Sequence, residues 1–201
     1  MPNPYFSFKQ FTVYHDRCAM KVGTDGVLLG AWTEVSDARD ILDVGTGTGL
    51  ISLMLAQRSE AHIMAVDIDE DAVKQAEENV KNSPWPDRIE VEHHDICHFD
   101  SDIRYDVIVS NPPYFVNSLK CPDGQRNMAR HTVGLNFESL INSCGRLLSS
   151  SGRFSVIIPT DGMDEFMKIA SEEGLYLSRR TWIKTKPDAT PKRVLMEFKK
   201  Q

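Results

Sequence analysis

From about Ile41 onward, short runs of apolar residues alternate with longer amphipathic stretches. The short runs are typical of buried strands and the longer stretches of helices, so the alternation predicts a parallel sheet covered by helices. Seven strands are predicted, over residues 41–44, 62–66, 89–94, 106–110, 153–158, 175–185 and 193–199. Helices are predicted over residues 50–58, 69–82, 137–148 and 164–173. The expected fold class is therefore α/β, with a doubly wound, mostly parallel, seven-stranded sheet.

The last two predicted strands have no room between them for a crossover helix. Residues 186–191 read KPDATP, and two prolines in so short a segment are typical of a loop. The two strands must therefore pair as a C-terminal antiparallel hairpin. Doubly wound sheets bind ligands at the carboxyl ends of their parallel strands, so candidate site residues are sought there.

Length and composition favour one compact domain. The chain has 201 residues, of which 41% are hydrophobic and 26% charged, and these are globular proportions. We expect an N-terminal arm over 1–36 that packs on a single domain over 37–201, with a substrate loop at about 112–134. The four scattered cysteines form no CxxC pair, and neither a secretory signal nor a membrane-spanning apolar run is present. We therefore expect a cytoplasmic protein.

The first predicted strand leads directly into a glycine-rich turn that opens a helix. Residues 43–49 follow the pattern D-x-G-x-G-x-G, whereas the dinucleotide fingerprint would need glycine where the chain has Leu50. The glycines allow a tight turn that brings N–H groups against a ligand, and the Asp43 carboxylate can meet the ammonium of an amino-acid-bearing ligand. The alternatives are a plain structural turn or a dehydrogenase loop of unusual spacing. The candidate ligand-binding residues here are Asp43, Gly45, Thr46 and Gly47.

Acidic residues end the next two predicted strands. Asp67 ends the second, where a carboxylate can accept hydrogen bonds from both hydroxyls of a ribose. Asp95 follows the third, where an adenine amino group would need an acceptor. Helix or turn capping is the alternative for both, and capping is the interpretation we favour for Asp69. We interpret Asp67 and Asp95 as ligand-binding residues.

The fourth predicted strand ends in the tetrapeptide Asn111-Pro112-Pro113-Tyr114. The Asn111 side-chain carbonyl and the Pro112 backbone carbonyl can each accept one hydrogen of an exocyclic amine. This restrains the amine and favours localisation of its lone pair, which is otherwise delocalised into the ring. Tyr114 can stack on a base that has been drawn out of its stack. The alternative is an ordinary turn after a strand.

The glycine loop, the two acidic strand ends and the NPPY tetrapeptide together resemble the S-adenosylmethionine-dependent methyltransferases that act on planar amino groups. The segment KVGTD at 21–25, followed by VLLGAW at 27–32, resembles more specifically the arm of the bacterial tRNA(Val) adenosine-37 methyltransferases. The resemblance implies S-adenosylmethionine as cofactor and the exocyclic amino nitrogen of a tRNA adenine as acceptor. It places the following arm residues over the cofactor: Lys21, Gly23, Thr24 and Asp25. It also matches Arg126, Arg130 and His131 to the family's loop after NPPY, where a plain surface loop is nearly as good an interpretation.

Charge adds an observation that does not depend on the resemblance. The whole chain has a formal net charge of −6, yet residues 175–201 hold eight Lys and Arg side chains against two acidic ones. An acidic body with a basic hairpin suits a phosphate backbone that approaches from one side. Protection of a sheet edge by lysine is an equally good interpretation. The candidate RNA-binding residues are Arg126, Arg130, Lys184, Lys186, Lys192 and Arg193.

A cluster of His93, His94, Cys97 and His98 suggests a metal site, but strand alternation sends His93 and His94 to opposite faces. No metal is therefore expected.

Two enzymatic alternatives keep the cofactor and change the acceptor, to a release-factor glutamine amide or to a guanine amino group of ribosomal RNA. The release-factor enzymes carry a helical N-terminal domain, for which this chain is too short. A noncatalytic RNA-binding module is a third alternative, and the intact Asn111 and Tyr114 argue against it.

Overall fold

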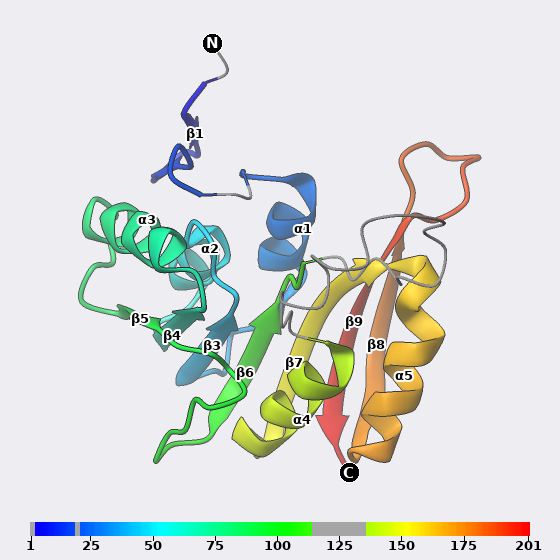
Figure 1. The fold of residues 1–201 in the computed structure, drawn as a ribbon. Helices are drawn as coiled ribbons and strands as arrows, with labels where there is room; N and C mark the ends of the chain where they lie inside the picture. Colours follow the sequence, from blue (N-terminus) through cyan, green and yellow to red (C-terminus); the bar gives the residue numbers. More distant parts are fainter. Residues whose placement is uncertain (1–2, 19–20, 114–135) are drawn as a thin grey trace, which may run out of the picture.

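A seven-stranded sheet forms the centre of the molecule in a computed structural model that describes residues 3–18, 21–113 and 136–201 (Figure 1). The strand order is β5-β4-β3-β6-β7-β9-β8. The strands are β3 (Asp40–Val44), β4 (His62–Asp67), β5 (Ile89–His93), β6 (Tyr105–Ser110), β7 (Leu148–Pro159), β8 (Leu175–Ile183) and β9 (Arg193–Lys200). Strand β9 lies between β7 and β8 and is antiparallel to both, while the other pairs are parallel. The predicted fold class, including the C-terminal hairpin, is confirmed.

Helices cover both faces of this sheet. The first set is α1 (Thr24–Trp32), α2 (Leu50–Arg58) and α3 (Glu70–Lys81), and the second is α4 (Phe137–Leu147) and α5 (Met163–Glu172), preceded by the 3₁₀ turn Thr160–Gly162. Alternation along the strands separates two cores: Ile41 packs with the first set, and its neighbour Leu42 packs with the second. The chain turns from β3 toward β4 and β5 on one side and toward β6 and β7 on the other. The topological switch point therefore lies between β3 and β6.

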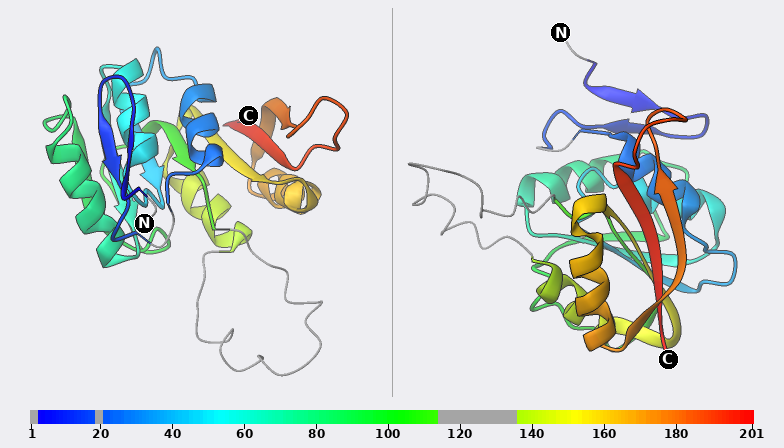
Figure 2. Two further views of the ribbon diagram at one scale, coloured as in Figure 1. Left: turned by 90° about the horizontal axis from the view of Figure 1, so that it is seen from above. Right: turned by 90° about the vertical axis from the view of Figure 1, so that its right-hand side faces the viewer.

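The first residues of the chain form a separate two-stranded hairpin, β1 (Tyr5–Ser7) and β2 (Thr12–Tyr14), beside α3 (Figure 2). Two fully buried amide side chains of α3 hold it. Asn79 accepts a hydrogen bond from the Tyr14 N–H (2.9 Å) and donates from Nδ2 to the Tyr14 carbonyl (2.8 Å). Gln75 accepts from the Arg17 N–H (3.0 Å). The same Asn79 Nδ2 also donates to the carbonyl of Thr48 (2.8 Å), so one side chain joins the hairpin to the glycine loop.

Strand β7 begins at Leu148, five residues earlier than its predicted start. Leu148 pairs with Tyr105 before the register shifts, and pairing then resumes at Arg153. Between these points, a Cβ on Gly152 would lie 2.8 Å from the Tyr105 carbonyl oxygen, so only glycine allows the close approach. The run of serines and glycine at 149–152, which resembles a turn in sequence, is therefore strand.

Candidate active site

The glycine-rich turn joins β3 to α2 at the carboxyl end of the sheet. Gly45, Gly47 and Gly49 all have positive φ (71°, 57° and 78°), a conformation that favours glycine. A Cβ on Gly45 or Gly47 would meet no atom within 4 Å, whereas one on Gly49 would lie 3.4 Å from the Ala76 Cβ. The first two glycines therefore border open space and the third packs on α3. Open space on this side of the turn leaves room for a ligand.

Three backbone N–H groups at the start of this turn donate within the protein. Those of Gly45 and Thr46 both donate to the Val66 carbonyl (2.9 and 3.1 Å), and that of Gly47 donates to Asp67 Oδ2 (2.8 Å). The contact of the turn's N–H groups with a ligand stays a prediction, because in the structure the end of β4 accepts from all three. The open Cα positions of the turn offer a further surface for a ligand.

Asp43, the last residue but one of β3, is fully buried beneath the turn. Its Oδ2 accepts hydrogen bonds from Thr46 Oγ1 (2.8 Å), Ser52 Oγ (2.7 Å) and the Ser52 N–H (3.2 Å), which tie the turn to α2. Its Oδ1 is buried and has no partner among the described residues. Burial raises the pKa of Asp43 to about 6, although these hydrogen bonds act in the opposite direction. The contact of Asp43 with a ligand ammonium stays a prediction, and Oδ1 is the atom with capacity for it.

The other two acidic strand ends combine capping with spare acceptor capacity. Asp67 Oδ1 accepts from the Asp69 N–H (3.0 Å), in addition to the bond from Gly47 to Oδ2. Asp95 Oδ1 accepts from the Cys97 N–H (2.9 Å), and this bond is the main reason that the pKa of Asp95 is lowered. Each oxygen keeps a further lone pair. As favoured from the sequence, Asp69 caps α3 by accepting from the Asp71 N–H (2.9 Å).

Ile68 is an apolar residue at this edge that sequence reasoning missed. It follows Asp67 directly and is 62% exposed. The signal was available, because an isoleucine between the aspartate that ends a strand and the aspartate that caps the next helix belongs to the apolar pattern of neither element. Its exposed side chain offers an apolar surface beside the ribose-binding candidate Asp67.

Asn111 follows the last residue of β6 and lies beneath α1. Its Oδ1 is buried and has no hydrogen-bond partner among the described residues. A Cβ on Gly26 of α1 would lie 4.0 Å from Asn111 Nδ2 and 3.1 Å from Leu50 Cδ2, so the arm helix, Asn111 and the start of α2 meet at one point. Pro112 is buried and Pro113 is exposed. Tyr114, Arg126, Arg130 and His131 lie outside the described residues.

The arm brings its predicted cofactor-binding residues close to the point where α1, Asn111 and the start of α2 meet. Lys21, Gly23 and Thr24 are exposed and precede Gly26 by a few residues, where the chain enters α1. Asp25, in the first turn of α1, accepts from Arg193 Nε (2.9 Å). Arg193, predicted as an RNA contact, is thus half-buried in an ion pair with the arm. The sequence alone gave no sign of this pair, because 168 residues separate its members.

The lysines of the hairpin lie at the carboxyl edge as well. Ile183 and Pro159 both pair with Arg193, so the loop from β8 to β9 emerges where the parallel strands end (Figure 1). Lys184, Lys186 and Lys192 are exposed in this loop. The fold therefore brings these three candidates to the edge that holds Asn111. Arg193 differs from them because its guanidinium is in an ion pair with Asp25.

Two other regions carry no catalytic candidates. Among the described residues, no group of three or more His, Cys, Asp or Glu side chains is arranged to hold a metal ion. His93 Nε2 contacts the Ile68 carbonyl (2.9 Å) and His94 contacts Glu92 (3.0 Å), so the two rings have separate partners.

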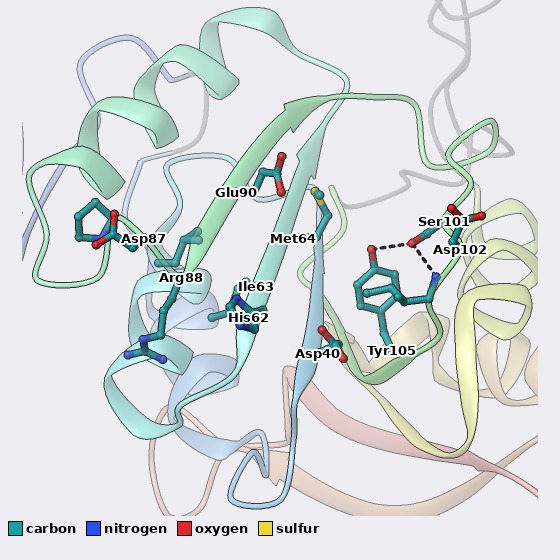
Figure 3. Close-up of a pocket in the computed structure, with 13 residues that line it drawn as sticks. Asp40, His62, Ile63, Met64, Asp87, Arg88, Glu90, Ser101, Asp102 and Tyr105 are labelled. Atoms are coloured by element: carbon teal, nitrogen blue, oxygen red, sulfur yellow. Dashed lines mark hydrogen bonds between the residues drawn. The ribbon is translucent and has the colours of Figure 1, made fainter.

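A cavity of about 550 Å³ lies at the opposite edge of the sheet, between the starts of β3, β4, β5 and β6 (Figure 3). None of the predicted site residues lines it.

Comparisons with known proteins show which family the chain belongs to. Residues 20–161 match the family model of the methyltransferase small domain. The chain is 68% identical to the tRNA1(Val) (adenine(37)-N6)-methyltransferase of Phocaeicola vulgatus, with 99% of this chain and 85% of the relative covered. It is 58% identical to the protein of the same name from Bacteroides thetaiotaomicron, with 98% and 84% covered.

Solved structures share the fold at lower identity. A predicted O-methyltransferase from Agrobacterium tumefaciens has a TM-score of 0.68 at 22% identity, with 87% of this chain and 80% of that chain covered. The N-methyltransferase NodS from Bradyrhizobium japonicum, in complex with S-adenosyl-L-homocysteine, has a TM-score of 0.62 at 17% identity, with 87% and 83% covered. The chain therefore belongs to the methyltransferase small domain family and, over nearly its whole length, to the tRNA1(Val) (adenine(37)-N6)-methyltransferases.

Proposed function

We propose that this protein transfers a methyl group from S-adenosylmethionine to the exocyclic amino nitrogen of adenosine 37 in tRNA(Val). The observation that carries the proposal is the buried, unpartnered Oδ1 of Asn111 beside a glycine turn that borders open space. A buried acceptor without a donor is costly, and a substrate amine would satisfy it. The names of relatives at 68% and 58% identity support the same reaction and the same nucleotide.

The cofactor fits the half of the edge formed by β3, β4 and the arm. When bound, S-adenosylmethionine supplies a methyl group carried on a positively charged sulfur. Gly45 and Gly47 offer open positions over the turn, and the carboxylate of Asp67 is already fixed by the Gly47 N–H to accept ribose hydroxyls. Asp95 offers the acceptor for an adenine amino group. The remaining proposed cofactor contacts are Lys21, Gly23, Thr24, Asp43, Thr46 and Asn111.

Catalysis then depends on orientation of a weak nucleophile. Asn111 Oδ1 and the Pro112 carbonyl each accept one hydrogen of the adenine amine, which directs its lone pair at the methyl carbon. Because Asn111 Oδ1 is buried beneath α1, the acceptor is held in a water-poor position and needs little reorganisation. Tyr114, outside the described residues, is proposed to stack on the extruded base.

The tRNA is proposed to be held by Lys184, Lys186 and Lys192, and by Arg126 and Arg130, which lie outside the described residues. The position of the three lysines supports this role over edge protection, because they lie in the loop beyond the paired residues Ile183 and Arg193. We keep Arg193 as a weaker candidate, because its guanidinium is engaged by Asp25. Within the described residues no helix is long and apolar enough to cross a membrane. A tRNA substrate supports a location in the cytoplasm.

A transfer assay with three acceptors tests the proposal. The protein is incubated with tritium-labelled S-adenosylmethionine and either tRNA(Val), ribosomal RNA or a release factor, and the products are hydrolysed and separated. We expect label in N6-methyladenosine from tRNA(Val), and none from a matched transcript with guanosine at position 37. Labelled N2-methylguanosine or methylglutamine would move the function to one of the alternative acceptors. Cofactor binding with no transfer to any acceptor would indicate a noncatalytic module.

A further inference from the structure

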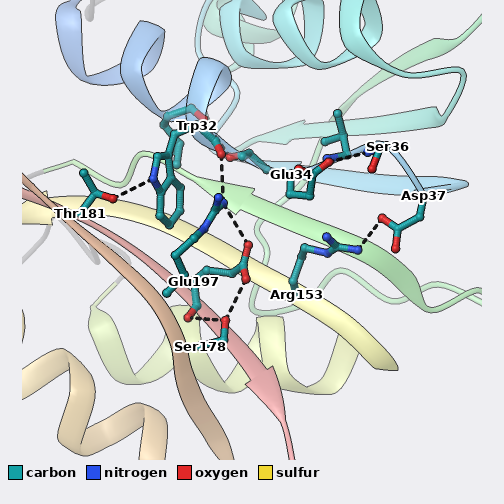
Figure 4. Close-up of polar contacts among 12 residues, drawn as sticks. Trp32, Glu34, Ser36, Asp37, Arg153, Ser178, Thr181 and Glu197 are labelled. Atoms are coloured by element: carbon teal, nitrogen blue, oxygen red, sulfur yellow. Dashed lines mark hydrogen bonds and ion pairs between the residues drawn. The ribbon is translucent and has the colours of Figure 1, made fainter.

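Strand β8 carries two adjacent arginines that each lie over a tryptophan ring, on opposite faces of the sheet. The first pair is structural. Arg179 lies 3.8 Å from the ring centroid of Trp32 and donates to the Trp32 carbonyl (3.0 Å) and to the buried Glu197 (3.2 Å) (Figure 4). The Trp32 indole N–H donates to Thr181 Oγ1 (3.0 Å). Every element of this pair serves to fix the end of α1 on β8 and β9.

The second pair has no such structural use. Arg180 lies 4.8 Å from the ring centroid of Trp182, and Trp182 is 42% exposed. Apart from the ring, Arg180 has a weak contact with Met163 Sδ (3.8 Å), and it forms no ion pair within the described part of the chain. Because Trp182 keeps 42% of its surface exposed, part of the indole still faces water, and the cation beside it has no acidic partner among the described residues. This arrangement is suited to an external partner with flat rings and negative charge.

The position of Trp182 relates it to the proposed active site. Trp182 is the last residue but one of β8, directly before the loop that carries Lys184, Lys186 and Lys192. The strand order β6-β7-β9-β8 places the line of β8 three strand spacings from that of β6, which is about 14 Å. A polynucleotide that delivers a base to Asn111 can therefore cover Trp182 with a nucleotide a few positions away.

We propose that Trp182 and Arg180 form a base-stacking platform for an unpaired nucleotide of the RNA substrate, near the target adenine in sequence. This inference rests on the proposed function, which supplies the RNA. Single-stranded RNA is bound by aromatic faces and arginine planes for its bases together with basic side chains for its phosphates. Arg180 covers one side of the indole, the exposed part of the ring receives the base, and the adjoining lysines contact the phosphates.

Binding of a tRNA anticodon stem-loop to the full chain, measured at several salt concentrations, tests the platform. Trp182→Leu should weaken binding about fivefold or more, because one base-stacking contact is lost. The slope of log affinity against log salt should not change, because no charge is removed. Trp182→Phe should recover part of the lost affinity, and Arg180→Gln should both weaken binding and reduce the slope by about 0.7.

Tyr176→Leu is the matched control. Tyr176 is as exposed as Trp182 (43%) and lies on the same strand, but at its start, next to the opposite edge of the sheet. Its replacement should leave binding unchanged, and thermal unfolding should show that every variant folds. Wild-type affinity of Trp182→Leu, or equal losses in Trp182→Leu and Tyr176→Leu, would overturn the platform even if wild-type protein methylates tRNA. If wild-type protein methylates no RNA, the proposed function fails, and the platform fails with it.

Discussion

The two halves of the carboxyl edge differ in how far their polar groups are hydrogen-bonded within the protein. Toward β3 and β4, the N–H groups of Gly45, Thr46 and Gly47 and both oxygens of Asp67 are hydrogen-bonded within the protein. At the end of β6, Asn111 Oδ1 is buried without a partner among the described residues. The turn and Asp67 in the first half are therefore held by internal hydrogen bonds before any ligand arrives, with Asp43 Oδ1 beneath the turn as their one buried acceptor that has no partner among the described residues. The second half keeps, in Asn111 Oδ1, an acceptor at the strand end itself that a donor from outside the described residues can satisfy. The difference teaches that cofactor binding and amine positioning are separate tasks of one sheet edge.

The largest expected effect is that of Asn111→Ala. Turnover should fall about 100-fold or more, because a preorganised acceptor for the amine is lost. The change in cofactor affinity should be smaller. Because the carbonyl has no partner among the described residues, its removal should not lower the melting temperature by the amount expected for a lost buried hydrogen bond. Turnover within a few fold of wild type would remove Asn111 from the catalytic role.

The next effect concerns the buried carboxyl of the cofactor half. Burial raises the pKa of Asp43 to about 6 from 3.8, so the folded state binds a proton more tightly than the unfolded state. The stabilising contribution of the protonated carboxyl is complete below pH about 4 and is lost as pH rises through about 6. Asp43→Asn lacks this titration, so the free energy of unfolding of wild type minus that of the variant should fall with pH, by up to about 3 kcal/mol.

Urea unfolding of both proteins between pH 4 and 7 measures this difference. Carboxyls such as Asp95, whose lowered pKa gives the opposite pH dependence, are present in both proteins and cancel in the comparison. A difference that is constant over this range would show that Asp43 has an ordinary pKa in the folded protein. It would then not be the desolvated group on which the shape of the turn depends.

Asp67→Ala should weaken S-adenosylmethionine binding by about 1.5–3 kcal/mol, through loss of charge-assisted bonds to the ribose and of the acceptor for the Gly47 N–H. Titration calorimetry measures the affinity. Asp69→Ala is the matched control, because Asp69 caps α3 two residues further on and should affect helix stability rather than affinity. Equal losses of affinity in the two variants would mean that Asp67 acts through local folding.

The smallest effects are expected at the RNA-binding loop. If Lys184, Lys186 and Lys192 contact phosphates, replacement of each by glutamine should lower the magnitude of the salt slope of RNA binding by roughly 0.7 to 0.9. Lys74→Gln, in an ion pair with Glu70 on α3, is the control and should leave the slope unchanged. A slope equal to that of wild type in the triple variant would assign the lysines to protection of the sheet edge.

Sequence reasoning succeeded where one residue ends a strand or directly follows it. Asp67 and Asn111 were placed correctly at the carboxyl edge because the apolar runs before them fix where the strands end. It failed where the partner is remote in sequence. Gln75 and Asn79 resemble the solvent face of an amphipathic helix, and their burial depends on a hairpin about 60 residues earlier. The ion pair of Arg193 with Asp25 and the use of the loop N–H groups by β4 are similarly set by tertiary contacts.

The most direct test of the division between the two halves is the single-turnover rate of methyl transfer to tRNA(Val), measured for Asp67→Ala and Asn111→Ala across a range of S-adenosylmethionine concentrations. At saturating cofactor, Asp67→Ala should return to within a few fold of the wild-type rate, because its defect is in binding. Asn111→Ala should stay about 100-fold or more below wild type, because no cofactor concentration replaces the lost acceptor. Recovery of both variants, or of neither, would contradict the assignment of the two tasks to separate halves of the edge.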